Sequence, residues 1–293
     1  MKKLFAAVLM TCALAVNANA LYISGSGGTV SGEDDYKGTN VNLLIGLENL
    51  AIEPSWKAYS NEDTDTVNTY ALRAAWETNV YTAGIYGGFT PKKAYLKANP
   101  AEYSNQFVGA DFTLSLNPTG STHSRLVGPG NRGISAGGEG ITRVDVGAGI
   151  KQTAHKTEYA GTDNKTGQTE YQVFAGVQFL MLNISGGMSY YDYQDKDSAT
   201  VDFVNGLNYA TLSYPGLAPD NAFNLRVDVP FFPIVTPFVG YSKVKYSEDH
   251  INSYEVGTYL DFAMLKATVS YQITEHDSHH DGYLSAGIGL AFE

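Results

Sequence analysis

The chain has 293 residues, and its 30 acidic and 19 basic side chains give a formal net charge of −11 at pH 7. This acidity argues against a nucleic-acid partner, because binding phosphates requires a basic surface. Cys12 is the only cysteine. The chain after it therefore has no thiol and cannot form an internal disulfide.

The first twenty residues predict a secretory signal peptide. Lys2 and Lys3 precede an apolar run at 4–16, and Ala18-Asn19-Ala20 forms an A-x-A cleavage site. We therefore expect residues 1–20 to be removed and residues 21–293 to fold as one domain. After the apolar run, no stretch is apolar and long enough to form a membrane-spanning helix.

Alternating apolar and polar residues predict β-strands along the whole exported chain. The predicted strands cover 21–30, 40–48, 50–59, 67–77, 80–90, 107–116, 141–152, 171–179, 182–193, 223–229, 234–246, 251–262, 265–274 and 281–293. The last one shows the pattern well, with apolar Leu284, Ile288 and Phe292 alternating with small residues such as Ser285. A tilted transmembrane β-strand needs roughly 9–11 residues with this alternation.

The connections between these strands alternate between short and long. Short turns are predicted near Asn49, Asn79, Met181, Phe231 and Met264. Long polar loops are predicted at 31–38, 61–65, 91–104, 154–168, 195–221, 247–250 and 276–280. Short turns at one rim and long loops at the other are the plan of a transmembrane barrel. The segment 117–140 departs from this plan, because it is long yet falls at the short-turn rim.

Charged residues within the predicted strands all share a face with glycine, serine and threonine. A lipid-facing Arg or Lys at mid-depth costs about 2–4 kcal/mol, so a barrel must turn such residues inward. The candidate pore-lining residues are Glu53, Lys57, Arg73, Glu77, Asp111, Arg143, Asp145, Lys151, Arg226, Asp228, Glu255, Asp261 and Lys266. A soluble β-sandwich would sort charges in the same way, but it would have to pack about 14 long strands around one core. We therefore predict an all-β, transmembrane antiparallel up-and-down β-barrel of about 14 strands, within a range of 12–16.

Three features together resemble the bacterial outer-membrane β-barrel proteins. They are the signal peptide ending in Ala18-Asn19-Ala20, the alternating segments, and the closing strand LSAGIGLAF at 284–292. The resemblance covers the whole chain as a pattern and indicates no specific family. In that class the last strand usually ends on its aromatic residue, whereas here Glu293 follows Phe292. The resemblance implies location in the bacterial outer membrane, with outer-membrane lipid and lipopolysaccharide as partners.

The leading functional prediction is a porin-like channel for passive diffusion of small hydrophilic solutes or ions, without a cofactor. The segment 195–221 is the first candidate for a loop that narrows the bore, and 117–140 is the second, acting from the periplasmic side. The alternative is a closed barrel with a structural, adhesive or ligand-binding role through its extracellular loops. Interleaved inner charges fit either a field across a pore or a set of internal ion pairs.

A hydrolase would need a serine and a histidine on neighbouring strands, facing the same way. The sequence predicts that all of the histidines lie in or beside loops: His123, His155, His250, His276, His279 and His280. We therefore expect no enzymatic activity. His276, His279 and His280 suit Zn²⁺, Ni²⁺ or Cu²⁺ by ligand type, but they lack a fixed ligand spacing. The sequence favours a polar hairpin tip over a metal site there.

Overall fold

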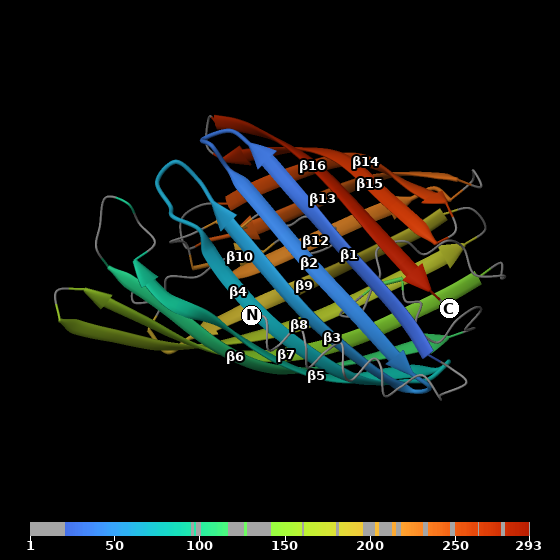
Figure 1. The fold of residues 1–293 in the computed structure, drawn as a ribbon, viewed down its shortest axis with the longest axis horizontal. Coiled ribbons are helices and arrows are strands. Elements are labelled where there is room, and N and C mark those ends of the chain that lie inside the picture. The colour runs from blue at the N-terminus through green and yellow to red at the C-terminus, as the bar shows by residue number, and fades with distance from the viewer. Residues whose placement is uncertain are drawn as a thin grey trace.

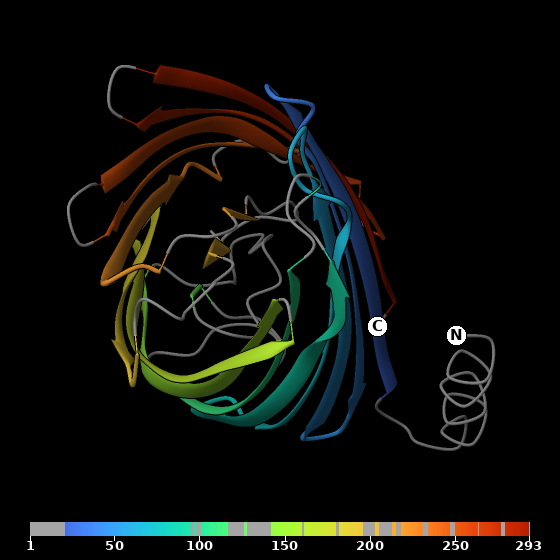
Figure 2. The ribbon, with the colours of Figure 1, turned by 90° about the vertical axis from the view of Figure 1, so that its left-hand side faces the viewer.

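The structure is a computed structural model of the chain. It describes residues 21–94, 97, 101–116, 126–127, 142–159, 161–179, 182–195, 203–204, 213–214, 218–230, 234–246, 250–262, 264–276 and 279–292. Within these residues, fourteen antiparallel strands close into one barrel, seen from the side in Figure 1 and from one end in Figure 2. The predicted barrel of about 14 strands is confirmed, while the predicted signal peptide lies outside the described residues.

The strands follow the predicted order along the chain. They are β1 (Leu21–Gly32), β2 (Lys37–Leu47), β3 (Leu50–Ser60), β4 (Val67–Glu77), β5 (Tyr81–Ala94), β6 (Glu102–Leu116), β7 (Thr142–Tyr159), β8 (Thr162–Phe179), β9 (Leu182–Tyr193), β10 (Phe203–Val204), β11 (Ser213–Tyr214), β12 (Asn221–Asp228), β13 (Val235–Lys245), β14 (His250–Phe262), β15 (Leu265–His276) and β16 (His279–Phe292). Each barrel strand pairs with its neighbours in the chain, except that β9 pairs directly with β12. The short strands β10 and β11 form a separate pair.

The barrel closes where the last strand meets the first. β16 pairs with β1 from Ile23↔Phe292 to Gly32↔Tyr283, so the predicted C-terminal strand completes the sheet. Gly32 lies directly against the Tyr283 ring, and a Cβ at this position would collide with it. Closure pairs the first strand with the last, so the ring has no open side, which is the condition for a sheet to stand in lipid.

The two faces of the sheet differ as the alternation predicts. Large apolar side chains stay exposed on the outside, among them Ile85, Val108 and Ile288. The residues between them are buried and polar, as Thr113 and Asp145 illustrate. Because successive side chains in a strand point to opposite faces, the apolar set forms an outer belt and the polar set lines the interior. An apolar outside around a polar inside is the arrangement that a lipid bilayer demands.

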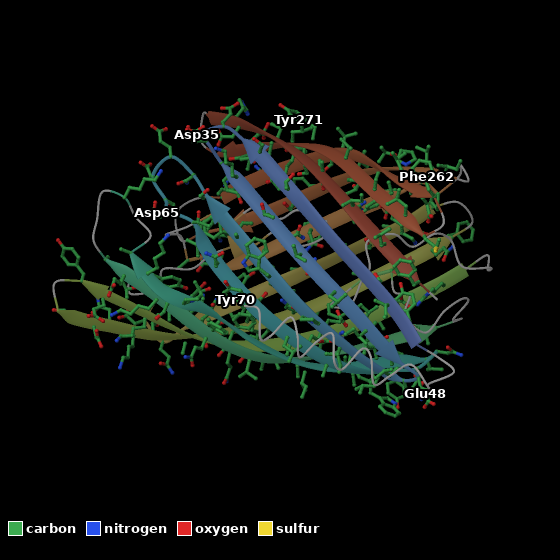
Figure 3. All side chains as sticks on the ribbon, viewed as in Figure 1. Asp35, Glu48, Asp65, Tyr70, Phe262 and Tyr271 are labelled. Atoms are coloured by element: carbon green, nitrogen blue, oxygen red, sulfur yellow. The ribbon has the colours of Figure 1, made fainter. Side chains whose placement is uncertain are left out.

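The two rims of the barrel are distinct. Figure 3 places Asp35 and Asp65 at one end and Glu48 and Phe262 at the other. We call the end that carries Glu48 the short-turn rim and the end that carries Asp35 the long-loop rim. β7 and β8 are the longest strands, and they extend past their neighbours at the long-loop rim (Figure 1).

This extension corrects one prediction. The sequence placed a polar loop at 154–168, but β7 runs on to Tyr159 and β8 begins at Thr162. The turn between them includes Gly161, whose φ of 82° favours glycine. The alternation signal fails here because both faces of the hairpin are polar beyond the apolar belt.

Two predicted insertions are described only in part. Leu126 and Val127, from the segment 117–140, are buried. In the segment 195–221, β10 and β11 lie inside the ring of barrel strands (Figure 2). No helix in the described part of the chain is long and apolar enough to cross a membrane.

Candidate functional site: the inner face of the barrel

All thirteen candidate pore-lining residues lie in described strands, on the face opposite the apolar belt. The buried ones are Arg73, Glu77, Asp111, Arg143, Asp145 and Arg226. The half-buried ones are Glu53, Lys57, Lys151, Asp228, Glu255, Asp261 and Lys266. The structure joins most of them into ion pairs, each described below, and their role in a pore is taken up under the proposed function.

Arg73 forms the most extensive of these ion pairs. Its Nε donates to Asp111 Oδ2 at 2.9 Å and its Nη2 to Asp111 Oδ1 at 2.7 Å, a bidentate pair. Its Nη1 donates to Glu53 Oε1 at 2.5 Å. Arg73 lies on β4 and Asp111 on β6, so the guanidinium must cross β5. It does so over Gly84, where a Cβ would lie 2.6 Å from Arg73 Nη2. One arginine thus connects three strands, β3, β4 and β6, and passes over the fourth, β5.

A second ion pair holds the described part of the 117–140 segment. Arg143 Nε donates to Asp145 Oδ1 at 3.0 Å, and the Leu126 backbone N–H donates to Asp145 Oδ2 at 2.8 Å. Leu126 and Val127 rest on Gly176 of β8, where an added Cβ would lie 2.8 Å from Leu126 Cβ. Leu126 and Val127, which we call the inner contact, therefore lie inside the barrel against β7 and β8, near the short-turn rim.

A third ion pair contains a residue that the sequence analysis missed. Lys151 contacts the Glu170 carboxylate, and Gln172 Nε2 donates to Glu170 Oε1 at 2.5 Å. Glu170 is buried on the inner face of β8. The predicted loop ended at residue 168 and the next predicted strand began at Tyr171, so Glu170 was assigned to neither. The alternation of Gln168, Glu170 and Gln172 was the available signal, but Tyr171 is the only apolar residue between them.

The opposite wall of the barrel carries two further pairs. Arg226 Nε donates to Asp228 Oδ1 at 2.7 Å, and the guanidinium carbon lies 3.6 Å from the centre of the Phe238 ring. Such a stacked, desolvated guanidinium gains a cation–π contribution. Lys266 Nζ lies 3.4 Å from Asp261 Oδ2. The remaining candidates, Lys57, Glu77 and Glu255, also have interactions with their surroundings.

A buried hydrogen-bond chain lies above these ion pairs, toward the long-loop rim. Tyr103 OH lies 2.8 Å from His155 Nδ1, and His155 Nε2 lies 2.9 Å from Gln168 Oε1. Gln168 Nε2 donates to Tyr193 OH at 3.1 Å. The prediction that His155 lies in or beside a loop is wrong: it is an inward-facing strand residue, and 3% of it is exposed. The polar hairpin concealed it as it concealed Glu170.

The C-terminal histidine cluster forms a hairpin tip. The backbones of His276 and His279 are paired, but their side chains lie outside the described residues. His280 Nδ1 is 3.6 Å from Glu275 Oε1, and both side chains are exposed. Among the described residues, no group of three or more His, Cys, Asp or Glu side chains is placed to hold a metal ion.

No protein-family model and no curated protein matches the sequence. Several solved structures are similar in fold. CdiB from Acinetobacter baumannii aligns with a TM-score of 0.51 at 11% identity, over 93% of this chain and 60% of CdiB. The monoaromatic hydrocarbon channel CymD gives 0.50 at 10% identity, over 95% of this chain and 89% of CymD. The P. putida toluene transporter TodX gives 0.48 at 9% identity, over 96% of this chain and 92% of TodX. At identities of 10–11%, the likeness to CdiB and CymD is one of fold alone.

Proposed function

We propose that the chain is an outer-membrane channel through which small hydrophilic solutes and ions diffuse passively, without a cofactor. The proposal rests mainly on the separation of apolar and charged side chains between the two faces of the barrel wall. A closed ring of fourteen strands turns apolar side chains outward and charged side chains inward. A barrel of this strand number is wide enough for a polar bore. The fold shared with CymD, a channel for monoaromatic hydrocarbons, supports a channel in general, while the hydrophilic class of solute rests on the polar inner face.

The inner charges suggest which ions pass more readily. Carboxylates already outnumber cationic groups by seven to six among the thirteen candidates, and Glu170 on the same face raises the carboxylates to eight. A ring of acidic side chains favours cations in a channel. We therefore expect weak cation selectivity. The proposal includes export by the signal peptide at 1–20, and contact with outer-membrane lipid and lipopolysaccharide on the apolar outside.

The test is single-channel recording from refolded residues 21–293 in a planar bilayer under a salt gradient. Asp261→Asn removes a carboxylate from a half-exposed inner pair, so we expect it to lower cation selectivity. Lys266→Gln removes the opposing charge and should raise it. Glu48→Gln changes an exposed charge in a turn outside the bore and serves as the matched control. Equal reversal potentials in all four proteins would contradict a pore lined by this pair.

A closed barrel that acts through its long-loop rim is the second candidate, and one observation favours it. At least five of the six predicted basic residues are paired with carboxylates, and Lys57 also has an interaction with its surroundings. Such pairing is expected for a closed interior whose charges neutralise one another. The inner contact and the β10–β11 pair also lie within the ring. A folded, heat-modifiable barrel without conductance steps would favour this candidate over the channel.

A further inference from the structure

The hydrogen-bond chain around His155 crosses four strands at the long-loop rim. Tyr103 and Asn105 belong to β6, His155 to β7, Gln168 to β8 and Tyr193 to β9. Asn105 Nδ2 donates to Tyr103 OH at 2.9 Å, which extends the chain at one end. Each hydrogen bond joins adjacent strands or two residues of one strand. The His155 imidazole lies in the middle of this hydrogen-bond chain and joins Tyr103 of β6 to Gln168 of β8.

This hydrogen-bond chain lies beyond the apolar belt, toward the long-loop rim. The outer face of β7 is apolar from Val144 to Ile150, but further along it carries Gln152, Lys156 and Glu158, with the small Ala154 between them. Lys156, next to His155, points outward and lies 2.8 Å from Asp163 Oδ2. An exposed ion pair of this kind belongs in water and not in lipid. His155 therefore stands in the aqueous part of the barrel.

The partners of His155 fix its neutral form. Gln168 Nε2 donates to Tyr193, so Gln168 Oε1 faces the imidazole and can only accept. His155 Nε2 must then carry the hydrogen, and Nδ1 must accept from Tyr103 OH. A second proton on Nδ1 would turn this acceptor into a donor facing a hydroxyl donor. The Tyr103 hydroxyl would have to rotate and find another acceptor.

The surrounding charges also oppose a second proton. Among the described residues, no carboxylate is bonded to His155. From β7 itself Lys151 faces the same interior, and from β8 Glu170 faces it too but is engaged by Lys151. The partners from β6 and β9 are the neutral Tyr103, Asn105 and Tyr193. Burial, and to a smaller extent the Lys151 charge, lower the pKa of His155 below its ordinary value.

At Tyr193, the hydrogen-bond chain reaches the residues that directly follow β9. Directly after Tyr193, the Gln194 N–H donates to Gly167 O at 2.9 Å, and the Asp195 N–H donates to Thr166 Oγ1 at 2.9 Å. Thr166 is the residue that pairs with His155 across the β7–β8 ladder. Gln194 and Asp195 are thus fixed to the same piece of wall that the imidazole organises.

We propose that His155 is a proton-sensitive latch, which holds Gln194 and Asp195 to the barrel wall when neutral and releases them when protonated. Gln194 and Asp195 follow directly on β9, so release detaches the chain from the wall where this strand ends. This local release does not rest on the proposed channel function.

Amide hydrogen exchange followed by NMR at pH 7.5 and pH 4.0 tests the release directly, because the lower pH lies well below the ordinary pKa of histidine. In the wild type we expect the protection factors of Gln194 and Asp195 to fall by about tenfold at pH 4.0, as for the loss of one hydrogen bond. His155→Gln, which cannot titrate, should keep equal protection at both pH values. His280→Gln changes an exposed histidine at the same rim and should behave as the wild type does.

A second variant keeps the test valid if His155→Gln does not fold. Tyr103→Phe removes the hydroxyl that donates to Nδ1 while it keeps the ring, so protonation becomes easier and release should begin at a higher pH. Unchanged wild-type protection between the two pH values would overturn the latch, as would an equal acid loss in His155→Gln. Conductance at pH 7.5 tests the channel separately, whatever the exchange data show.

Discussion

The ion pairs inside the barrel and those at its long-loop rim use the same side chains in opposite surroundings. Inside, the Arg73–Asp111 pair has side chains that are 8% and 0% exposed. At the rim, the Lys92–Glu102 pair is 44% and 43% exposed, with a similar distance of 2.7 Å. Geometry alone therefore does not separate the two regions. Burial does, because removing one partner of a buried pair leaves a charge that water cannot reach.

The comparison also shows what each region contributes. One inner pair connects strands that are not neighbours, because Arg73 on β4 crosses β5 over Gly84 to reach Asp111 on β6. The other inner pairs join adjacent strands or two residues of one strand. The rim pairs join long, flexible side chains that water and salt screen, and such pairs add little to stability. Replacing one charged residue of an inner pair is therefore expected to destabilise the barrel, whereas replacing one at the rim is expected to change its stability little.

Arg73→Met should give the largest effect of any substitution in this comparison. It leaves Asp111 and Glu53 charged and without their cation inside the wall, so we expect a loss of about 3–5 kcal/mol in the free energy of unfolding. Urea unfolding of the barrel in lipid vesicles, followed by tryptophan fluorescence, measures this loss. The fluorescence signal comes from Trp56 and Trp76.

Glu53→Gln is the matched control for that substitution. It removes the less buried partner, which is 18% exposed, and it leaves the bidentate Arg73–Asp111 pair intact. Its cost should be clearly smaller than that of Arg73→Met. Equal costs for the two variants would mean that burial does not set the strength of these pairs.

The strands within the belt could be predicted from the sequence because lipid imposes one rule along their whole length. Apolar residues must face outward, so alternation is strong where strands such as β5 and β16 cross the belt. Beyond the belt that rule ends, and water on both faces permits polar residues at every position. The second half of β7 and most of the first half of β8 were therefore predicted as a loop, so His155 was placed wrongly and Glu170 was left out of the predicted strand.

The candidate site was predictable as a face and not as a set of contacts. Sorting charges against the apolar positions found thirteen residues that the structure places on the inner side. It could not find that Arg73 pairs with Asp111, since that pairing depends on strand order and on a glycine in the intervening strand. The contact of Leu126 with Asp145 was also beyond reach, because no periodicity relates an irregular segment to a strand.

Gly176→Val should give an intermediate effect, by displacing the inner contact. The new side chain would occupy the space of Leu126 and Val127, and overpacking of this kind costs about 1–3 kcal/mol. If the chain is a channel, the displaced segment should also alter single-channel conductance. Gly240→Ala is the control, because a Cβ there meets only ordinary contacts with Glu255. Unchanged stability and conductance in Gly176→Val would show that the inner contact is dispensable.

Lys156→Gln should give the smallest change in the free energy of unfolding, and it tests an exposed rim pair against the buried inner pairs. Lys156 lies 2.8 Å from Asp163 Oδ2 and 3.5 Å from Glu158 Oε2, so distance alone would rank it with the inner pairs. Because all three side chains are about a third exposed or more, solvent screens the attraction and each carboxylate is hydrated when the lysine is removed. We expect an unfolding curve that overlays the wild type, both in dilute buffer and in 1 M NaCl. A loss in dilute buffer as large as that of Arg73→Met would mean that the rim pairs, like the inner ones, help to hold the wall together.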